Sequence, residues 1–452
     1  MPSSIKGINS LIREFIDKKE ERINWPPDRL KSFRNTALRI FMERIKSKST
    51  WHSKRLKDVD CSNITEDDLA SIPSMSKNDL LNNFDEIVTV PNLKLRICKN
   101  HLKTEASGGG FINRRYRVSI SGGTSGNPAL TVFNTREFQL NAMSSLRLIS
   151  RWAKQNNFIE DKKRIVRITT PDPVFRSQHV ARSLNSTYII SIVNPIQSII
   201  AELNMIQPDI LFTYPSILPR LAEEAQEGRL KISPKLIIGG AEPMLVEHAS
   251  AVKRVWNSKL FDGWGSTEVG VLAVASGYDP GMLLLDDFVI LEPVNKDGLP
   301  VKKGEQTEKV FVTPLFRYTL PLLRYEVTDQ VNFIDTPASC GSGFRRISNV
   351  ENRLEDVFKY YGSIEVHPKL FLSILGAEVS ILEYQVHQTK KGADVLVTSN
   401  KNVDCDRLKK LITAGLLESG LQNPVVSIKI VDRIGRTGAA KKFKRFFPLN
   451  GK

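Results

Sequence analysis

The sequence has few cysteines, and none of them is close enough to another to suggest a metal site or a disulfide framework. Four cysteines are spread over 452 residues, and the six histidines are equally scattered. The cysteines are Cys61, Cys98, Cys340 and Cys405. Isolated thiols that stay reduced are typical of cytoplasmic proteins, so we expect no structural zinc and no disulfide-stabilised fold.

Long apolar runs are also missing. No uninterrupted apolar stretch approaches the ~20 residues that a membrane-spanning helix needs. The first 25 residues have no apolar core of the kind found in signal peptides, and their pattern is that of a surface helix. The sequence therefore predicts a cytoplasmic protein without a membrane span.

What the sequence has in excess is positive charge, with a formal net charge of +16. Such a charge fits nucleic acid, an anionic membrane surface, an acidic protein partner, a phosphate-rich ligand or a merely solvated surface. The charge is spread over most of the chain, and only residues 441–452 form a local basic cluster. Because no compact nucleic-acid-binding module is visible, we expect no nucleic-acid partner.

The arrangement of apolar segments predicts an α/β protein. The first hundred residues are polar and mostly helical in pattern, with Ser76 in the place of a helix cap. From about residue 116, short apolar runs alternate with helical stretches, which favours a substantially parallel sheet. The runs are YRVSI, KRIVRITT, STYIISIV, DILFTY, PKLIIGG and SKLFDGW.

Two further changes of pattern suggest a second, smaller domain. Residues 280–345 are rich in strands and turns, with MLLLDDFVILEPV, KVFVTPL and LLRYEV as the strands. After about residue 350 come a hairpin around Lys391 and Gly392, an amphipathic helix and another strand. We expect a large N-terminal domain with mixed and parallel sheets plus helices, residues 1–350, and a small mobile α+β C-terminal domain, residues 351–452.

The most prominent motif is a loop rich in glycine and hydroxyl groups, within residues 119–133 (SISGGTSGNPALTVF). Glycines let the backbone turn sharply and bring its amides close to an anion, so the loop suits the phosphates of a nucleotide. It lacks the terminal lysine and the following helix of a Walker loop. A simple glycine-rich hairpin is the alternative. The candidate residues are Ser121, Gly122, Gly123, Thr124, Ser125 and Gly126.

Two more motifs follow strands of the predicted sheet. In IIGGAEPM, residues 237–244, a buried strand ends at two glycines; in FDGWGSTEVG, residues 261–270, a strand ends in a small-residue loop with Thr267 and Glu268. Ligands of α/β sheets bind at the carboxyl ends of strands, and a glutamate there can hold Mg²⁺. The alternatives are an ordinary turn for the first motif and a capped helix start for the second.

The last two motifs carry one candidate residue each. In PLLRYEVTDQV, residues 321–331, Asp329 follows a strand and can accept hydrogen bonds from ribose hydroxyls, although a lone aspartate there often only forms a turn. In RIGRTGAAKKFKRF, residues 433–446, small residues precede Lys441, which could reach a reacting phosphate. A solvated basic tail is the alternative, and Lys442 is the competing lysine if the motif slips by one residue.

The order of these motifs resembles the acyl-adenylate-forming superfamily, and most closely its phenylacetate–CoA ligase-like branch. The resemblance extends from about residue 65 to residue 447. It includes three further segments, SIPSMSKNDLLNNF near the start, TYPSIL before the GGAEPM motif, and NRLEDVFKYYG as a hinge motif. The sequence departs from the family pattern at four positions, which indicates a divergent member. They are Asn127 in the phosphate loop, Thr328 before the aspartate, and Asn352 and Glu355 in the hinge.

The resemblance implies ATP and Mg²⁺ as cofactors, a small carboxylic acid as substrate, and roles for individual residues. The catalytic residues would be Lys441, Thr267 and Glu268, with Glu268 also as the metal ligand. The nucleotide would contact the 121–126 loop, Gly240, Ala241, Glu242, Pro243, Trp264, Gly265, Ser266, Asp329 and Arg353. The acid would contact Tyr214, Gly239 and Trp264, with the segment around His179 near its pocket. Glu355 would be the hinge.

The implied reaction converts the acid to its acyl adenylate, releases pyrophosphate, and transfers the acyl group to a thiol with release of AMP. The thiol would belong to CoA or to an acidic acyl or peptidyl carrier protein, and the basic charge fits both. Two alternatives stay open. The adenylate could pass to an amine, or the protein could be a nucleotide-binding relative that has lost turnover.

Overall fold

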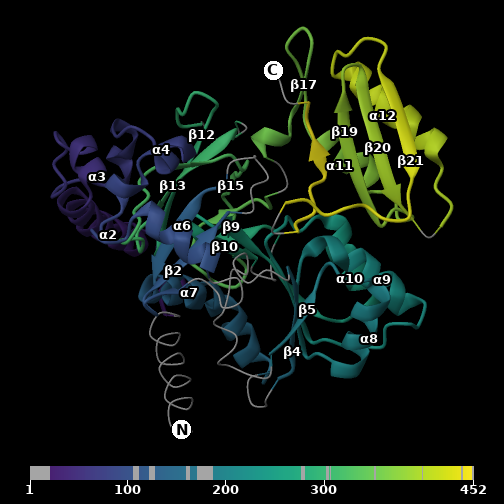
Figure 1. Ribbon diagram of the computed structural model, residues 1–452, viewed down its shortest axis with the longest axis horizontal. Helices are drawn as coiled ribbons and strands as arrows, with labels where there is room; N and C mark the ends of the chain where they lie inside the picture. Colours follow the sequence, from purple (N-terminus) through teal and green to yellow (C-terminus); the bar gives the residue numbers. More distant parts are fainter. Residues whose placement is uncertain are drawn as a thin grey trace.

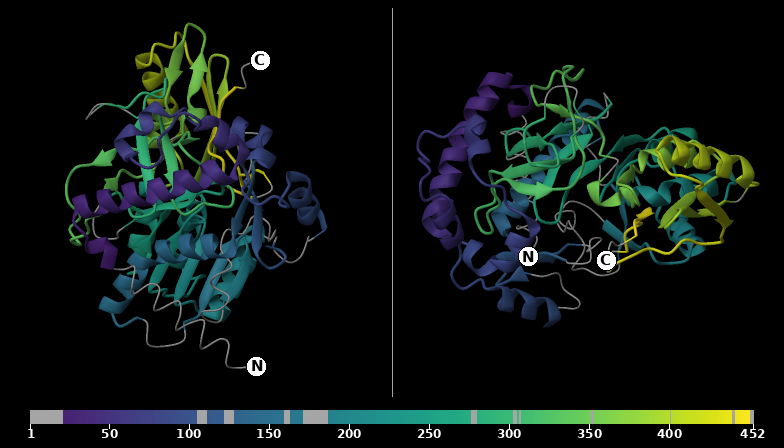
Figure 2. Two further views of the ribbon diagram at one scale, coloured as in Figure 1. Left: turned by 90° about the vertical axis from the view of Figure 1, so that its left-hand side faces the viewer. Right: turned by 90° about the horizontal axis from the view of Figure 1, so that it is seen from above.

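The computed structural model describes residues 21–104, 111–121, 128–158, 163–170, 187–275, 280–301, 305, 307–350, 353–399, 401–438 and 441–449. It has a large domain and a small C-terminal domain, as predicted (Figure 1). The N-terminal helices α2 and α3 lie on the opposite side of the molecule from the C-terminal strands β19–β21, as the view from above also shows (Figure 2).

The N-terminal part is helical, as the sequence indicates. Its elements are η1 (Glu21–Asn24), α2 (Pro27–Lys48), α3 (Thr50–Arg55), η2 (Glu66–Ser71), α4 (Lys77–Asn82), α5 (Phe84–Ile87) and α6 (Leu95–Thr104). Ser76 is the predicted cap of α4: its side chain accepts a hydrogen bond from the Asp79 amide, and the Asp79 carboxylate accepts one from the Ser76 amide. This reciprocal pair satisfies two amide groups that the first turn of the helix leaves without partners.

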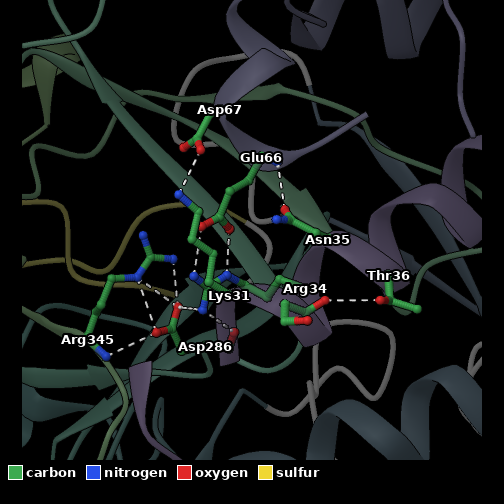
Figure 3. A network of polar contacts seen from close by, with 9 residues as sticks. Lys31, Arg34, Asn35, Thr36, Glu66, Asp67, Asp286 and Arg345 are labelled. Carbon is green, nitrogen blue, oxygen red and sulfur yellow. Dashed lines mark hydrogen bonds and ion pairs between the residues drawn. The ribbon is translucent and has the colours of Figure 1, made fainter. Parts of the chain in front are cut away.

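A buried ionic network fastens these helices to the β-rich part (Figure 3). Arg34 of α2 makes two hydrogen bonds to Glu66, at 2.6 and 2.9 Å, and its Nη1 lies 3.1 Å from the Asp286 carboxylate. Arg345 reaches the same carboxylate at 2.7 Å. Both Arg34 and Asp286 are buried. Each charge therefore depends on its partners to offset the loss of hydration.

The predicted parallel sheet is present, with strand order β5-β4-β6-β7-β8 and parallel pairing throughout. Its strands are β4 (Ile165–Thr169), β5 (Thr187–Ser191), β6 (Ile210–Thr213), β7 (Leu236–Gly239) and β8 (Lys259–Phe261). One face carries Val166, Leu211 and Ile237, which pack into a core with the helices of this part. These helices are α8 (Ile196–Ile206), α9 (Leu218–Gln226) and α10 (Val246–Val255). On the opposite face, Leu236 and Phe261 pack into a second core with Leu148 and Val274.

Antiparallel sheets complete the large domain. The first sheet precedes helix α7 (Thr135–Gln155) and contains β1 (Phe111–Ile112), β2 (Tyr116–Ile120) and β3 (Leu130–Asn134). A second sheet has the order β15-β16-β11-β10-β9, with β9 (Gly263–Ser266), β10 (Gly270–Ala275), β11 (Met282–Leu284), β15 (Phe333–Ile334) and β16 (Arg346–Ile347). The third contains β12 (Val289–Val294), β13 (Lys309–Pro314) and β14 (Tyr325–Val327).

The segment MLLLDDFVILEPV is not one strand. It forms β11 and β12, which belong to different sheets, and the chain turns between them at Asp286 and Asp287. Both carboxylates are buried in ion pairs, Asp286 with Arg34 and Asp287 with Arg147 at 2.7 Å. Each buried carboxylate therefore depends on an arginine from a distant part of the chain to offset its loss of hydration.

The C-terminal domain has its own hydrophobic core, formed by buried residues between Phe358 and Phe446. Its sheet has the order β21-β20-β19-β22. The strands are β19 (Glu383–Thr389), β20 (Gly392–Thr398), β21 (Val425–Ile430) and β22 (Phe446–Phe447), with α11 (Lys369–Leu375) and α12 (Cys405–Glu418). The hairpin β17 (Phe358–Tyr360) and β18 (Ile364–Val366) follows η6 (Leu354–Asp356). The predicted hairpin turn lies at Lys390 and Lys391. The domain boundary after residue 350 stays a prediction.

Across the described residues, none of the helices is both long enough and apolar enough to cross a membrane.

The ionic network predicts a strong dependence of stability on Arg34. Arg34→Met removes both hydrogen bonds to the half-buried Glu66 and one of the two arginines that pair with the buried Asp286, so the free energy of unfolding should fall by roughly 3–5 kcal/mol. Lys31→Met is the matched control. Lys31 lies on the same helix as Arg34, but its ion pair with Asp67 is exposed, and exposed pairs contribute little to stability. Urea denaturation followed by circular dichroism measures both. Equal losses would show that the buried network does not stabilise this part of the fold.

Candidate active site

Two adjoining cavities lie at the carboxyl ends of the parallel strands, where ligands of α/β sheets bind. The first has a volume of about 130 Å³ and lies between the sheet and the C-terminal segment; the second, of about 220 Å³, extends along the sheet face opposite α8, α9 and α10. Six residues line both. They are Ala241, Asp262, Gly263, Trp264, Gly265 and Lys442.

The GGAEP motif lies where β7 ends, as predicted. Gly239, Gly240 and Tyr214 line the second cavity, Glu242 and Pro243 line the first, and Ala241 lines both. A Cβ atom on Gly239 would lie 2.4 Å from the Met244 Cε atom and 3.1 Å from Asp262 Oδ1, so any larger residue there would have to displace these side chains. The sequence motif therefore forms a wall shared by the two cavities.

The WGSTE motif forms strand β9 and the turn into β10, and not the start of a helix. Trp264 and Gly265 line both cavities, while Ser266 and Thr267 line the second. The Ser266 hydroxyl donates a hydrogen bond of 2.8 Å to the Glu268 carboxylate, which is buried beneath the turn. The turn thus holds a hydroxyl group and a carboxylate close to the second cavity.

Asp329 follows β14 and is buried with both carboxylate oxygens engaged. The Trp264 indole N–H donates to one oxygen at 2.8 Å, and the Arg353 Nε group lies 2.8 Å from the other. A backbone bridge also joins Asp329 to Arg353. The charge of Asp329 raises the pKa of Arg353 above its ordinary value. Carboxylate oxygens keep further lone pairs, so this aspartate can still accept hydrogen bonds from a ligand.

The C-terminal segment inserts Lys442, and not Lys441, into the site. Lys442 lines both cavities, whereas Lys441 lines neither. The Thr437 amide donates to the Lys442 carbonyl at 2.9 Å, and this contact closes a turn in which Lys441 has a positive φ of 51°. Because of this turn, the side chains of Lys441 and Lys442 point in different directions. Lys441, the predicted residue, therefore lies outside both cavities and Lys442, the alternative, lines them, while the catalytic role of either lysine stays a prediction.

The charge of Lys442, from the C-terminal segment, is opposed by carboxylates from three motifs of the large domain. Burial lowers the pKa of Lys442, and the neighbouring Arg353 lowers it further. Three carboxylates oppose this shift, those of Glu242, Glu268 and Asp329. The ammonium group therefore lies among residues of three separate predicted motifs, which shows that these motifs converge in space.

Glu242 binds the C-terminal segment directly. Its Oε1 atom accepts a hydrogen bond of 2.6 Å from the Phe443 amide and one of 3.1 Å from Arg436 Nη1. Arg436 also donates to the Ser216 hydroxyl at 2.9 Å. Glu242 is buried by these contacts. The resemblance implies that Glu242 contacts the nucleotide; in the structure its carboxylate holds the segment next to Lys442.

Sequence reasoning missed Asp262, which lies between β8 and β9 and lines both cavities. Burial raises the pKa of Asp262 to about 7, although the amides of Gly263 and Met244 donate hydrogen bonds that act in the opposite direction. The signal was available in the sequence, because Asp262 follows a buried strand directly. It was overlooked beside the more prominent glycines and Glu268.

The remaining predicted residues are only partly accounted for. Ser121 is buried, accepts a hydrogen bond of 2.8 Å from the Ala129 amide and lines neither cavity, although Ser119 and Ile120 line the second. Glu355 is exposed at the edge of the first cavity, 3.4 Å from Arg353. Five loop residues lie outside the described part, namely Gly122, Gly123, Thr124, Ser125 and Gly126, as do Asn127, Asn352 and the segment around His179.

Within the described ranges, no group of three or more His, Cys, Asp and Glu residues could hold a metal ion. Mg²⁺ bound together with a nucleotide commonly uses only one or two carboxylates, and phosphate oxygens and water supply the other ligands. A single buried carboxylate such as Glu268 is compatible with that mode of binding.

Comparisons by sequence find no matching family model and no matching curated protein. Comparison of structures finds crystal structures of 2-hydroxyisobutyryl-CoA ligase. In the postadenylation state, bound to R3-HIB-AMP, that enzyme matches with a TM-score of 0.74 at 15% identity, over 95% of this chain and 91% of the other. In the thioesterification state, bound to 2-HIB-AMP and CoA, the TM-score is 0.59 at 16% identity, over 94% and 91%.

Anthranilate CoA ligase AuaEII in complex with anthranoyl-AMP is similar over 72% of this chain and 64% of its own, with a TM-score of 0.51 at 14% identity. At such low identities the comparisons establish the fold. The chain has the fold of 2-hydroxyisobutyryl-CoA ligase, and as a whole it matches that enzyme's postadenylation state more closely than its thioesterification state.

The contact between Glu242 and the C-terminal segment can be tested without any substrate. Arg436→Met removes one of the two donors to Glu242 Oε1, so the amides of residues 441–446 should exchange hydrogen about tenfold faster. Arg433→Met is the control, because Arg433 is exposed in the same segment. Hydrogen exchange measured by mass spectrometry reports both. Unchanged exchange in Arg436→Met would show that this contact does not hold the segment in place.

Proposed function

We propose that this protein uses ATP to activate a carboxylic acid as its acyl adenylate and then transfers the acyl group to a thiol, forming AMP and pyrophosphate. The observation that supports this most strongly is the position of Lys442. Its side chain comes from the C-terminal domain and lies where the two cavities meet, beside Asp329, Glu268 and Glu242. A cation in this position can contact a ligand in each of the two cavities.

The difficulty of the first half-reaction is electrostatic. A carboxylate must approach the α-phosphate of ATP, so two anions meet and negative charge accumulates in the transition state. A preorganised cation that contacts both groups lowers this barrier, because its position is fixed before the reaction. In our proposal Lys442 has this role and Thr267 donates a hydrogen bond to the α-phosphate. The reaction then needs no nucleophilic side chain.

The nucleotide would occupy the first cavity. Asp329 accepts hydrogen bonds from the ribose hydroxyls, with Arg353 and the Trp264 indole holding its carboxylate in place. Ala241, Pro243 and Gly265 form the adjoining wall. Glu268 is the proposed ligand of Mg²⁺, which would neutralise charge on the ATP phosphates when bound. The loop of residues 121–126 is proposed to bind the pyrophosphate part.

The arrangement of the two domains fits the adenylating half of the reaction. A lysine that is used only in adenylation must leave the site before a thiol can approach the adenylate. The C-terminal domain therefore has to rotate between the two half-reactions. Glu355 remains our proposed hinge, because it lies at the start of η6 between the two domains. The contacts of Glu242 with Arg436 and Phe443 would then have to break in the second half-reaction.

The acceptor is proposed to be the thiol of CoA, because structural neighbours include CoA ligases caught with an acyl adenylate and CoA. An acidic carrier protein would also suit the net charge of +16. An amine acceptor is the alternative, since the amide bond synthetase McbA from Marinactinospora thermotolerans has a TM-score of 0.50 with this chain at 14% identity, over 72% of this chain and 67% of the other. A cytoplasmic location stays a prediction from the sequence.

The products of ATP cleavage test the proposed reaction. With ATP, Mg²⁺, CoA and a panel of aryl, fatty and short hydroxy acids, at least one acid should give AMP and pyrophosphate in equal amounts. Omitting CoA should still allow exchange of labelled pyrophosphate into ATP, because adenylation precedes transfer. Formation of ADP and phosphate would contradict the proposal, since attack at the γ-phosphate is a different chemistry.

The two adjacent lysines provide a matched pair of variants. Lys442→Ala should slow adenylation by roughly 10²–10³-fold, the usual effect of removing one preorganised donor, and should spare transfer from presynthesised adenylate. Lys441→Ala should leave both steps nearly unchanged, because that side chain lines neither cavity. Single-turnover kinetics of the two half-reactions give both values. Loss of adenylation in Lys441→Ala alone would show that the other lysine is the reactive one.

A further inference from the structure

The second cavity contains two arginines that the adenylation chemistry does not use. Arg117 comes from β2 and Arg167 from β4, and both line the cavity. Successive side chains of a strand point to opposite faces, so Arg117 shares the cavity face with Ser119, while Val118 packs into the core on the other side. Both guanidinium groups are therefore directed by strand geometry toward the cavity.

Arg167 lies in a row of side chains that crosses the face of the parallel sheet opposite α8, α9 and α10. The strand register pairs Arg167 with Phe212, Phe212 with Ile238, and Ile238 with Phe261. All four line the second cavity. This row lies two residues below Thr169, the last residue of β4, which corresponds to a depth of ~7 Å along the strand. The floor of the cavity is thus apolar with a cation at one end.

Aromatic rings hold both arginines in place. The guanidinium carbon of Arg117 lies 4.6 Å from the centre of the Phe138 ring, and that of Arg167 lies 5.0 Å from the centre of the Phe212 ring. Among the described residues that line this cavity, Arg117, Arg167 and Lys442 are cationic, and Asp262 is the one acidic residue. The lining therefore carries an excess of positive charge next to apolar walls.

The two arginines also act on each other. Burial lowers the pKa of Arg117 to about 10, and the charge of Arg167 contributes to the same shift. Arg117 is 3% exposed. Placing two cations close together in a poorly hydrated site is unfavourable, and an anionic ligand that contacts both relieves the repulsion.

The position of the arginines separates them from the proposed phosphate site. Arg117 precedes Ser121, where the glycine-rich loop begins, by four residues of extended chain, or ~13 Å. Lys442 lines both cavities and so lies where they meet, whereas Arg117 and Arg167 line only the second. A molecule that fills this space would have one end beside Lys442 and the other beside the arginines.

We propose that the second cavity selects an acid with two anionic groups, a dicarboxylic acid with an apolar spacer. One carboxylate lies beside Lys442 and is activated, the spacer contacts Phe212 and Phe261, and the other carboxylate pairs with Arg167 and Arg117. This inference rests on the proposed function for the identity of the reacting end. The preference for a dianion rests only on the residues that line the second cavity.

Matched pairs of acids test the proposal in the full chain. Each dicarboxylic acid from succinate to pimelate is compared with the monocarboxylic acid of the same length, and isophthalate with benzoate, by pyrophosphate exchange. The best dicarboxylic acid should have a kcat/KM at least about tenfold above its monocarboxylic partner, the usual size of a charge-assisted contact. Arg167→Met should remove this preference, and Arg167→Lys should keep part of it.

Arg164→Met is the matched control, because Arg164 precedes the same strand but is half-exposed and pairs with Asp209. It should leave the preference unchanged. The proposal is overturned if monocarboxylic acids are equally good substrates of the parent protein. It is also overturned if Arg167→Met raises the KM for ATP by the same factor with every acid, because Arg167 would then contact the pyrophosphate part of ATP and not the acid.

Binding of the acid in the absence of ATP tests the cavity assignment separately from the proposed adenylation reaction. The preferred dicarboxylic acid should raise the thermal unfolding midpoint of the parent protein and of Arg164→Met, but not that of Arg167→Met, while monocarboxylic partners raise none. If this pattern holds and no acid supports exchange, the cavity assignment stands and the adenylation proposal fails. If no dicarboxylic acid stabilises the folded parent protein, the cavity assignment is wrong.

Discussion

The site depends on one carboxylate, that of Glu242. It follows the sheet strand β7, yet its Oε1 atom accepts hydrogen bonds from the Phe443 amide at 2.6 Å and from Arg436 at 3.1 Å, both in the C-terminal domain. Because Phe443 adjoins Lys442, this contact fixes the register with which the lysine enters the junction of the two cavities. Without it, the residues of the large domain would form two clefts that contain no cation from the small domain. A charge-assisted contact of this kind is strong enough to position a segment and weak enough to be broken when the domains move.

The surrounding charges follow from the same arrangement. Lys442 brings a cation into a poorly hydrated place, and Asp329, Glu268 and Glu242 offset the cost, while Arg353 is held by Asp329. Ligands that are themselves anionic would find cations at three points, Lys442 at the junction and the two arginines in the second cavity. The apolar rings between these points leave little that would bind a polar spacer. The chemistry that we propose, and the dianionic acid that we infer, both arise from this separation of charge.

Much of the fold could be predicted from the sequence, because apolar runs separated by helical patterns determine a parallel sheet and its helices. The wrong expectation for residues 282–294 arose where Asp286 and Asp287 interrupt an apolar run, and their buried partners Arg34 and Arg147 are distant in the sequence. The motifs at strand ends could be found because ligands of α/β sheets bind at the carboxyl ends of strands. The same rule explains why these motifs lie close together in the structure. The choice between Lys441 and Lys442 could not be made, since it depends on the turn from Thr437 and on Glu242, some two hundred residues away. Arg117 and Arg167 were missed because an arginine within a strand gives no sign of the cavity that it faces.

The central claim is that a carboxylate oxygen of the substrate attacks the α-phosphate of ATP, and oxygen labelling tests it most directly. The acid that supports pyrophosphate exchange is prepared with ¹⁸O in its carboxylate and incubated with ATP, Mg²⁺ and the acceptor thiol. Thiol attack on the adenylate breaks the bond between the acyl carbon and the bridging oxygen, so that oxygen leaves with AMP. Mass spectrometry should therefore find one ¹⁸O atom in each AMP formed and none in pyrophosphate. Label in inorganic phosphate, or AMP without label, would contradict the account.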